Sequence, residues 1–131
     1  MKIKTLSVPV GDQQKALEFY TEKLGFQKNQ DIPLGGGNRW LTVVSPEEPD
    51  GPEILLEPAP LHFEPSKVYQ QAIYEKGMPW TQFNVDDCQA EYDKLVSLGV
   101  EFRAEPKEVP GAKMAILDDT CGNYIMIVQV L

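Results

Sequence analysis

Three side chains could together act in acid–base chemistry or hold a metal ion: Glu53, Glu57 and His62. Glu57 follows a short apolar run, where a carboxylate can serve as a general base or as a ligand. The alternative for Glu57 is a strand-end carboxylate that pairs with Arg39 or with solvent. His62 is the only histidine, and it falls outside the strand that holds both glutamates, which argues against a three-residue metal site.

Aromatic and amide side chains indicate a second kind of chemistry, the binding of a planar organic molecule. Trp80 could stack on such a ligand, with Trp40 and Tyr69 as further walls. Alternatively, Trp80 only fills volume. Gln82 and Asn84 share one face of a predicted strand, where each amide can both donate and accept a hydrogen bond. Ordinary solvated strand residues are the alternative for these two amides.

Thiols and arginines complete the set of reactive groups. Cys121 lies in a predicted turn, but no activating base is visible beside it, so a buried turn cysteine is favoured over a nucleophile. Cys88 is far away along the chain, so reduced thiols are expected rather than a redox or zinc pair. Arg39 and Arg103 are the only arginines. An anionic ligand would therefore meet one of them, although strand arginines are more often surface residues.

Two similar segments, residues 5–26 and 80–100, must position these side chains. Each has an alternating strand, an Asp, an amphipathic helix that ends at Gly, and a further strand. Asp12 and Asp87 stand where a carboxylate caps the first helical turn, and Gly25 and Gly99 stand where a helix ends with positive φ. The predicted apolar helix stripes are Ala16, Leu17, Tyr20 and Leu24 in the first copy and Cys88, Tyr92, Leu95 and Val96 in the second.

Further strands are predicted at 26–31, 39–44 and 53–57 in the first half, and at 101–105, 113–118 and 123–130 in the second. Each half is therefore a βαβββ module, about 1–62 and 78–131. The connector, about 63–77, contains a predicted helix at 66–76 with an apolar stripe of Val68, Ala72 and Ile73, after an extended proline-rich stretch. The predicted fold class is α+β: a single domain of two βαβββ modules that form a curved mixed sheet around a cleft.

The strand faces opposite the helices are expected to line that cleft. By alternation these faces carry Thr5 and Ser7 in the first module and Trp80, Gln82 and Asn84 in the second. A cleft with this mixed polar and aromatic lining suits a small organic ligand.

Composition excludes several classes of partner. The net charge of −8 repels phosphate backbones and anionic lipid surfaces, so neither nucleic acid nor a membrane is expected as a partner. The same charge favours a neutral or cationic ligand. No apolar run is long enough to span a bilayer, and the first residues lack the continuous apolar core of a signal peptide, so a cytoplasmic location is expected.

The two repeated segments, VPVGDQQKALEFYTEKLGF and FNVDDCQAEYDKLVSLGVEF, together with LDDTCGNYIMIVQ, resemble the vicinal oxygen chelate superfamily. This superfamily includes glyoxalase I, extradiol dioxygenases and bleomycin-resistance proteins. The resemblance implies paired βαβββ modules, commonly in a dimer. In its metal-dependent members, His or Glu ligands come from the first and last strand of each module. The corresponding residues here are Thr5, Glu57, Trp80 and Met126, of which only Glu57 is a ligand type.

The resulting hypothesis is a homodimer that binds a small organic molecule in a cleft, without a metal or other cofactor, as bleomycin-resistance proteins do. One alternative is a glyoxalase- or dioxygenase-type enzyme, a lyase or oxidoreductase, whose catalytic residue would be Glu57. A second alternative is a scaffold without a ligand. The expected ligand-binding residues are Thr5, Ser7, Trp40, Glu57, Trp80, Gln82, Asn84 and Met126.

Overall fold

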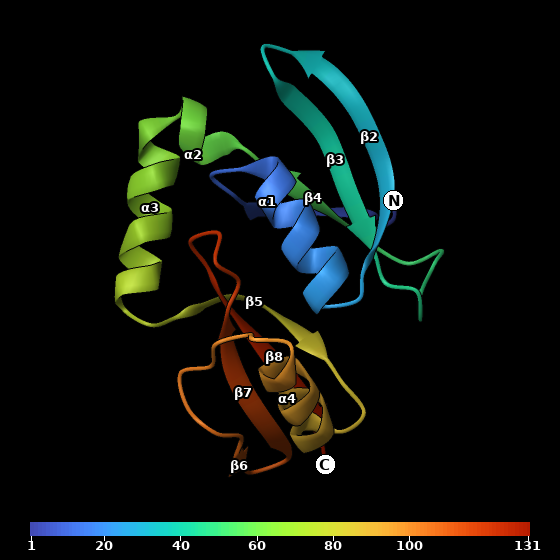
Figure 1. Cartoon of the computed structure of the whole chain (residues 1–131), viewed down its shortest axis with the longest axis vertical. Coiled ribbons are helices and arrows are strands. Elements are labelled where there is room, and N and C mark those ends of the chain that lie inside the picture. Colours follow the sequence, from blue (N-terminus) through green and yellow to red (C-terminus); the bar gives the residue numbers. More distant parts are fainter.

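The computed structural model describes all residues, 1–131, as two modules that each combine a four-stranded sheet with a helix (Figure 1). The first module consists of β1 (Thr5–Pro9), α1 (Gln13–Glu18), its π-helical continuation η1 (Phe19–Lys23), β2 (Gln27–Gly35), β3 (Asn38–Val44) and β4 (Glu53–Glu57). The second consists of β5 (Pro79–Asn84), α4 (Cys88–Ser97), β6 (Lys107–Val109), β7 (Ala112–Asp118) and β8 (Tyr124–Val130). Between them lie α2 (Ala59–His62) and α3 (Glu64–Glu75).

The two sheets have the same strand order, β1-β4-β3-β2 and β5-β8-β7-β6. In each, the first strand pairs in parallel with the last strand of its module, and the other pairs are antiparallel. The prediction of two βαβββ modules is therefore confirmed. The mixed strand pairing is divided between two open four-stranded sheets, one in each module.

The predicted helix caps are present in both modules. An oxygen of Asp12 accepts the backbone N–H of Lys15 at 3.0 Å, and Asp87 accepts that of Ala90 at the same distance. Each carboxylate satisfies an amide that has no partner within the helix. Gly25 follows the first helix with φ of 79°, a conformation that residues with a Cβ adopt only at a cost.

Both modules contribute to one hydrophobic core. The helix residues Ala16 and Tyr20 of the first module and Cys88 and Leu95 of the second belong to the same buried cluster. Phe26 extends the contact between the modules, because its ring lies edge-on to Phe83 at 5.1 Å. The core therefore lies on the helix-bearing side of both sheets and holds the modules together.

Three sequence expectations need correction. Val96 is 46% exposed, because the buried stripe of α4 is narrower than predicted. The stretch before α3 is not simply extended, since it contains α2, with Pro60 in the first turn, where a missing N–H breaks no helical bond. The stripe of α3 is also wrong: Val68 is 56% exposed, and the buried residue of this helix is Gln70.

The predicted strand at 101–105 is also wrong. Phe102 makes an isolated bridge to Leu117, and regular pairing begins only with β6 at Lys107. The backbone N–H of Arg103 donates a hydrogen bond to the carbonyl of Ile116 in β7, and regular pairing with β7 begins four residues later. No helix of the structure is both long and apolar enough to cross a membrane.

Candidate functional site

Each sheet has one face on the core and one face directed away from it, which we call the open face. In the first sheet the buried core side chains include Val8, Leu41 and Leu56, so their strand neighbours lie on the open face. The strand register places Thr5 beside Glu53, and Pro9 beside Glu57, on this face. The open face of the first sheet carries Thr5, Ser7, Trp40, Thr42, Glu53 and Glu57.

Glu53 is the most enclosed charged residue of this face, with only 1% of its surface exposed. One carboxylate oxygen accepts from Gln30 Nε2 at 2.9 Å, and the other accepts from the Thr42 hydroxyl at 3.4 Å. No cationic side chain lies within ion-pair distance of it. The sequence pattern identified Glu53 only as a possible metal ligand. Its hydrogen-bond partners come from other strands, so the pattern did not indicate them.

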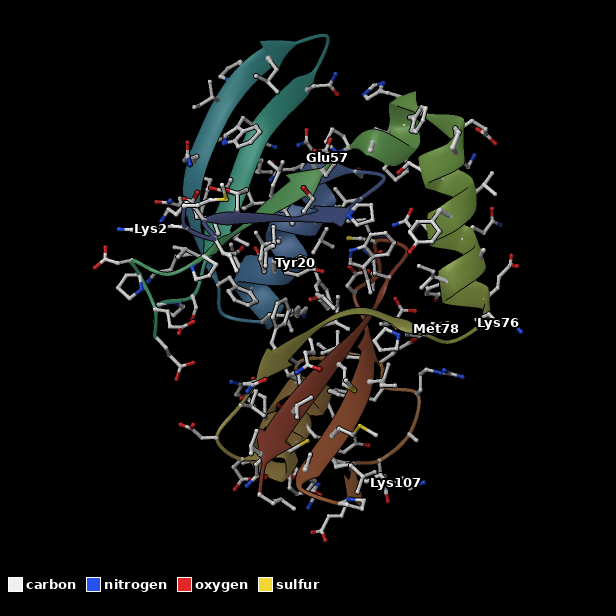
Figure 2. All side chains as sticks on the ribbon, turned by 180° about the vertical axis from the view of Figure 1, so that it is seen from behind. Lys2, Tyr20, Glu57, Lys76, Met78 and Lys107 are labelled. Carbon is white, nitrogen blue, oxygen red and sulfur yellow. The ribbon has the colours of Figure 1, made fainter.

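Glu57 is half-buried at the end of β4, where Figure 2 labels it. It forms no ion pair, and its backbone carbonyl accepts the N–H of Val10 at 2.8 Å. The suggested pairing with Arg39 is wrong, because Arg39 binds both carboxylate oxygens of Asp31, at 2.9 and 2.8 Å. These hydrogen bonds lower the pKa of Asp31. Glu57 therefore presents a carboxylate without a fixed partner.

The open face of the second sheet is more apolar. Ile125 and Ile127 of β8 point into the core, so Met126 lies on the open face, beside Ile116 of β7. Gln82 pairs in register with Met126, and both Gln82 and Asn84 are exposed on the edge strand β5. The predicted amides therefore flank an apolar surface.

Trp80 departs from simple alternation. The pairing of β5 with β8 is irregular between Pro79 and Thr81, and Trp80 packs against the core cluster. Its ring lies 5.5 Å from that of Tyr69, at an angle of 72°. The proposed neighbours Trp80 and Tyr69 are thus brought together, whereas Trp40 lies on the other module and pairs with neither ring.

The residues present do not suit a metal ion of the type that the family resemblance implied. Thr5, Trp80 and Met126 occupy three of the four positions, and none of them offers the carboxylate or imidazole donors that such ions prefer. No three His, Cys, Asp or Glu side chains gather anywhere in the chain as a possible metal site. His62 instead contacts Asn38 Oδ1 at 2.8 Å. We therefore derive no step that depends on a metal.

A buried polar network joins the modules behind the open faces. The Tyr20 hydroxyl donates to Asp119 at 2.8 Å, and Asn123 Nδ2 donates to Asp119 and to the Pro9 carbonyl, both at 2.8 Å. Gln70 Nε2, from the connecting helix, donates to the same Pro9 carbonyl at 3.0 Å. Sequence analysis missed this network, and its only visible signal was the polar turn at 118–123.

Cys121 lies in that turn and is half-buried. Burial and the neighbouring Asp119 raise the pKa of its thiol to about 12. At neutral pH the sulfur is therefore protonated and a poor nucleophile, in agreement with the expected turn cysteine.

The chain does not bring the two open faces together. No hydrogen bond links Thr5 or Ser7 to Gln82 or Asn84, and no strand pairing joins the two sheets. Figure 2 shows the two sheets one beyond the other, with both helices behind them. Two hollows in the surface each belong mainly to one module. The first, of about 350 Å³, lies between Asp12 and Asn38, and the second, of about 290 Å³, lies beside β7.

The model of the Glyoxalase/Bleomycin resistance protein/Dioxygenase superfamily matches residues 2–127, nearly the whole chain. The chain belongs to this superfamily. The sequence is 50% identical over 129 residues to the uncharacterized protein YurT of Bacillus subtilis (strain 168), which covers 98% of this chain and 99% of that protein. The superfamily assignment agrees with the paired βαβββ modules and confirms the resemblance seen in the repeated segments.

Solved structures of the superfamily fold share this architecture. The crystal structure of UcmS2 superposes with a TM-score of 0.82 at 31% identity and covers 98% of this chain and 97% of that chain. That of TnmS3, described as an antibiotic binding protein from Streptomyces sp. CB03234, has a TM-score of 0.75 at 27% identity and covers 100% of this chain and 97% of that chain. The superfamily fold therefore extends over the entire length of both.

Proposed function

We propose that this protein binds a small, partly aromatic organic molecule on the open faces of its sheets, without a metal. The observation that carries the proposal is the chemistry of Thr5, Trp80 and Met126 at the three positions discussed above. The Thr5 hydroxyl can hydrogen-bond to an organic molecule and the Met126 thioether can pack against one, while Trp80 packs against the core. None of the three is a good ligand for a metal ion.

The likeness to TnmS3 supports the same proposal, since that protein binds an antibiotic. Within the proposed site, Trp40 would form an aromatic wall and Met126 an apolar floor. Thr5, Ser7, Gln82 and Asn84 would hydrogen-bond to the ligand, as their exposed positions allow. Glu57 would attract a cationic or hydrogen-bonding group.

We propose further that a second copy of the chain completes the cleft. Within one chain no strand pairing joins the two open faces, so a ligand on one face is covered on one side only. In a homodimer the open face of the first sheet can meet that of the partner's second sheet, which would enclose the ligand and cover the exposed apolar residue Ile32.

The test uses naphthalene-2-carboxamide, an uncharged aromatic probe, and calorimetric titration. Binding is expected, and Met126→Asp is expected to weaken it about tenfold or more, because the change places a charge on the apolar face. Val68→Asp is the matched control, since Val68 is an exposed apolar residue of α3. Equal affinities of wild type and Met126→Asp would show that the second open face is not the site. Light scattering should give twice the mass of one chain, and a monomer would contradict the shared cleft.

A further inference from the structure

The two arginines of the chain differ in whether their charge is already neutralised. Arg39 makes a two-point ion pair with Asp31 and also donates to Gln14. Arg103 has no carboxylate within ion-pair distance. Its only side-chain hydrogen bond runs from one guanidinium nitrogen to the Gly77 carbonyl, at 2.6 Å. Because a guanidinium carries five N–H donors, most donors of Arg103 remain free.

The free guanidinium is nevertheless held in place. Its central carbon lies 5.1 Å from the ring centroid of Tyr124, and this ring stacks in parallel on Tyr74 at 4.4 Å. A Cβ at Gly77 would collide with the Arg103 guanidinium, and Gly77 has φ of 70°. Glycine at position 77 therefore allows the close approach that fixes Arg103. A positioned cation with free donors is suited to recognise an anion.

The chain beside Arg103 forms a hollow on the second module. Between the bridge at Phe102 and the pairing of Lys107, residues 103–106 lie opposite only two residues of β7, Ala115 and Ile116. The surplus residues bow away from the strand, and the resulting open hollow has a volume of about 290 Å³. The same surplus explains why no regular strand forms at 101–105.

The lining of this hollow combines apolar residues with two cations and one carboxylate. Met114 and Ile116 of β7 lie on the open face and supply apolar surface. Arg103 and Lys107 supply two cations, and neither forms an ion pair. Glu105 is the one acidic lining residue, and it too forms no ion pair. With two cations and one carboxylate, the lining of the hollow is locally positive in a chain with a net charge of −8.

We propose that this hollow binds the anionic end of a small aromatic carboxylate, with Arg103 as the residue that determines specificity. The aromatic body would cover Met114 and Ile116, while the carboxylate would accept hydrogen bonds from Arg103 and meet the charge of Lys107. This inference rests on the proposed function, since it names the ligand class for the second open face. It also revises the expectation of a neutral or cationic ligand. That expectation came from the net charge of the whole chain, whereas a bound ligand interacts mainly with the charged groups nearest to it, because salt screens the more distant charges.

The experiment compares naphthalene-2-carboxylate with naphthalene-2-carboxamide, which share a ring system and differ in charge. Dissociation constants are measured by calorimetry for wild type, Arg103→Gln, Arg103→Lys and Lys107→Gln. The control is Lys2→Gln, which removes the same charge from the first module; Figure 2 shows Lys2 and Lys107 in different modules, well apart. Circular dichroism and the melting temperature establish that each variant is folded.

In wild type the carboxylate is expected to bind about tenfold or more tightly than the carboxamide. Arg103→Gln should remove this preference, and Lys107→Gln should reduce it by a few-fold. Arg103→Lys should retain part of it, because the charge remains while the two-point geometry is lost. Lys2→Gln should preserve it.

Two results would overturn the inference. A carboxylate preference unchanged in Arg103→Gln would place the anion elsewhere, and binding of the carboxamide as tightly as the carboxylate would show that charge is not recognised. In the second case the proposed small-molecule function would stand, since the uncharged probe binds. If neither probe binds at millimolar concentration, both the ligand class and the proposed site are wrong.

Discussion

The hydroxyl of Tyr20 donates a hydrogen bond of 2.8 Å to Asp119, a residue 99 positions later in the chain. Both side chains are completely buried. Tyr20 belongs to η1 of the first module, and Asp119 belongs to the turn before β8 of the second. This hydrogen bond therefore forms only when the two modules are docked, and its removal tests how much it stabilises that docking.

Tyr20→Phe is expected to lower the free energy of unfolding by about 1–3 kcal/mol, because it leaves a buried carboxylate without one of its donors. Urea denaturation measures the change. Tyr92→Phe is the matched control: the Tyr92 ring packs edge-on against Phe102 at 4.7 Å, and its hydroxyl has no hydrogen bond in the structure. Equal effects of the two variants would show that the hydroxyl of Tyr20 does not stabilise the docking.

The same network predicts a pH dependence of stability. Burial raises the pKa of Asp119, although its hydrogen bonds to Asn123, Tyr20 and the backbone oppose the shift. A carboxyl group whose pKa is higher in the folded state binds its proton more tightly there. The contribution of Asp119 to the free energy of unfolding is therefore fully present at pH values below the pKa that this residue has in the unfolded chain. The contribution is lost as the pH rises from that value through the higher pKa of the folded state.

The measurement compares wild type with Asp119→Asn, which cannot ionise. As the pH rises from about 4 toward neutrality, the free energy of unfolding of wild type should fall relative to that of Asp119→Asn. The effects of the other carboxylates are common to both proteins, so they cancel in this comparison. A difference that moves in the opposite direction would mean that hydrogen bonding, rather than burial, dominates at Asp119.

Gly122 packs directly against the connecting helix. A Cβ at this position would lie 2.8 Å from Gln70 Nε2, and φ is 98°. Gly122→Ala should therefore cost more stability than Gly111→Ala, where φ is 81° but no atom lies within 4 Å of the added Cβ. In a Gln70→Ala background the extra cost should shrink, because the opposing side chain is gone. Thermal and urea unfolding of Gly122→Ala, Gly111→Ala, Gln70→Ala and the double variant of Gln70 and Gly122 test this prediction. If the extra cost persists without the Gln70 side chain, the added Cβ does not clash with Gln70.

Thr120 is the one residue other than glycine with positive φ, at 59°. A β-branched side chain is unfavourable in this conformation, whereas asparagine tolerates it. Thr120→Asn is thus expected to raise the free energy of unfolding by about 0.5–1 kcal/mol. The same exchange at the exposed strand residue Thr5 should not stabilise the protein. Loss of stability in Thr120→Asn would mean that the threonine side chain makes a favourable contact that outweighs the strain.

Metal content gives a separate prediction for the proposed function. Because Thr5, Trp80 and Met126 are poor ligands, the purified protein should contain no stoichiometric Zn, Ni, Mn or Fe, and EDTA should leave its melting temperature unchanged. Glu57→Gln should likewise leave binding of the uncharged naphthalene probe almost unchanged. One tightly held metal per chain, measured by elemental analysis, would refute a site without metal.

The sequence determined the local elements because their signals act over short distances. Asp12 and Asp87 cap the amides three residues ahead, and the apolar periodicity of Ala16 and Tyr20 selects one helical face. Strand alternation likewise predicted that Thr5 and Ser7 would lie on the face opposite Val8. These features depend on neighbours along the chain, so they were predictable without tertiary structure.

Only the tertiary structure decided which polar groups meet. The predicted apolar stripe of the connecting helix included Val68, yet Val68 is exposed and Gln70 is buried, with its amide donating to Pro9 of the first module. Similarly, the sequence offered Arg39 and Arg103 as equivalent cations, and the fold neutralised one and left the other free. Such pairings depend on the relative placement of segments tens of residues apart.

The arrangement of the modules was also beyond the sequence pattern. Alternation identified an open face on each sheet and led to the expectation of a shared cleft, but it did not determine how the two modules pack. The packing of Tyr20, Phe26 and Phe83 into a common core settled that the helix-bearing sides join, because burying these large side chains together removes the most apolar surface from water. The sequence alone therefore defined the modules and their open faces, and the common core decided how the two modules dock.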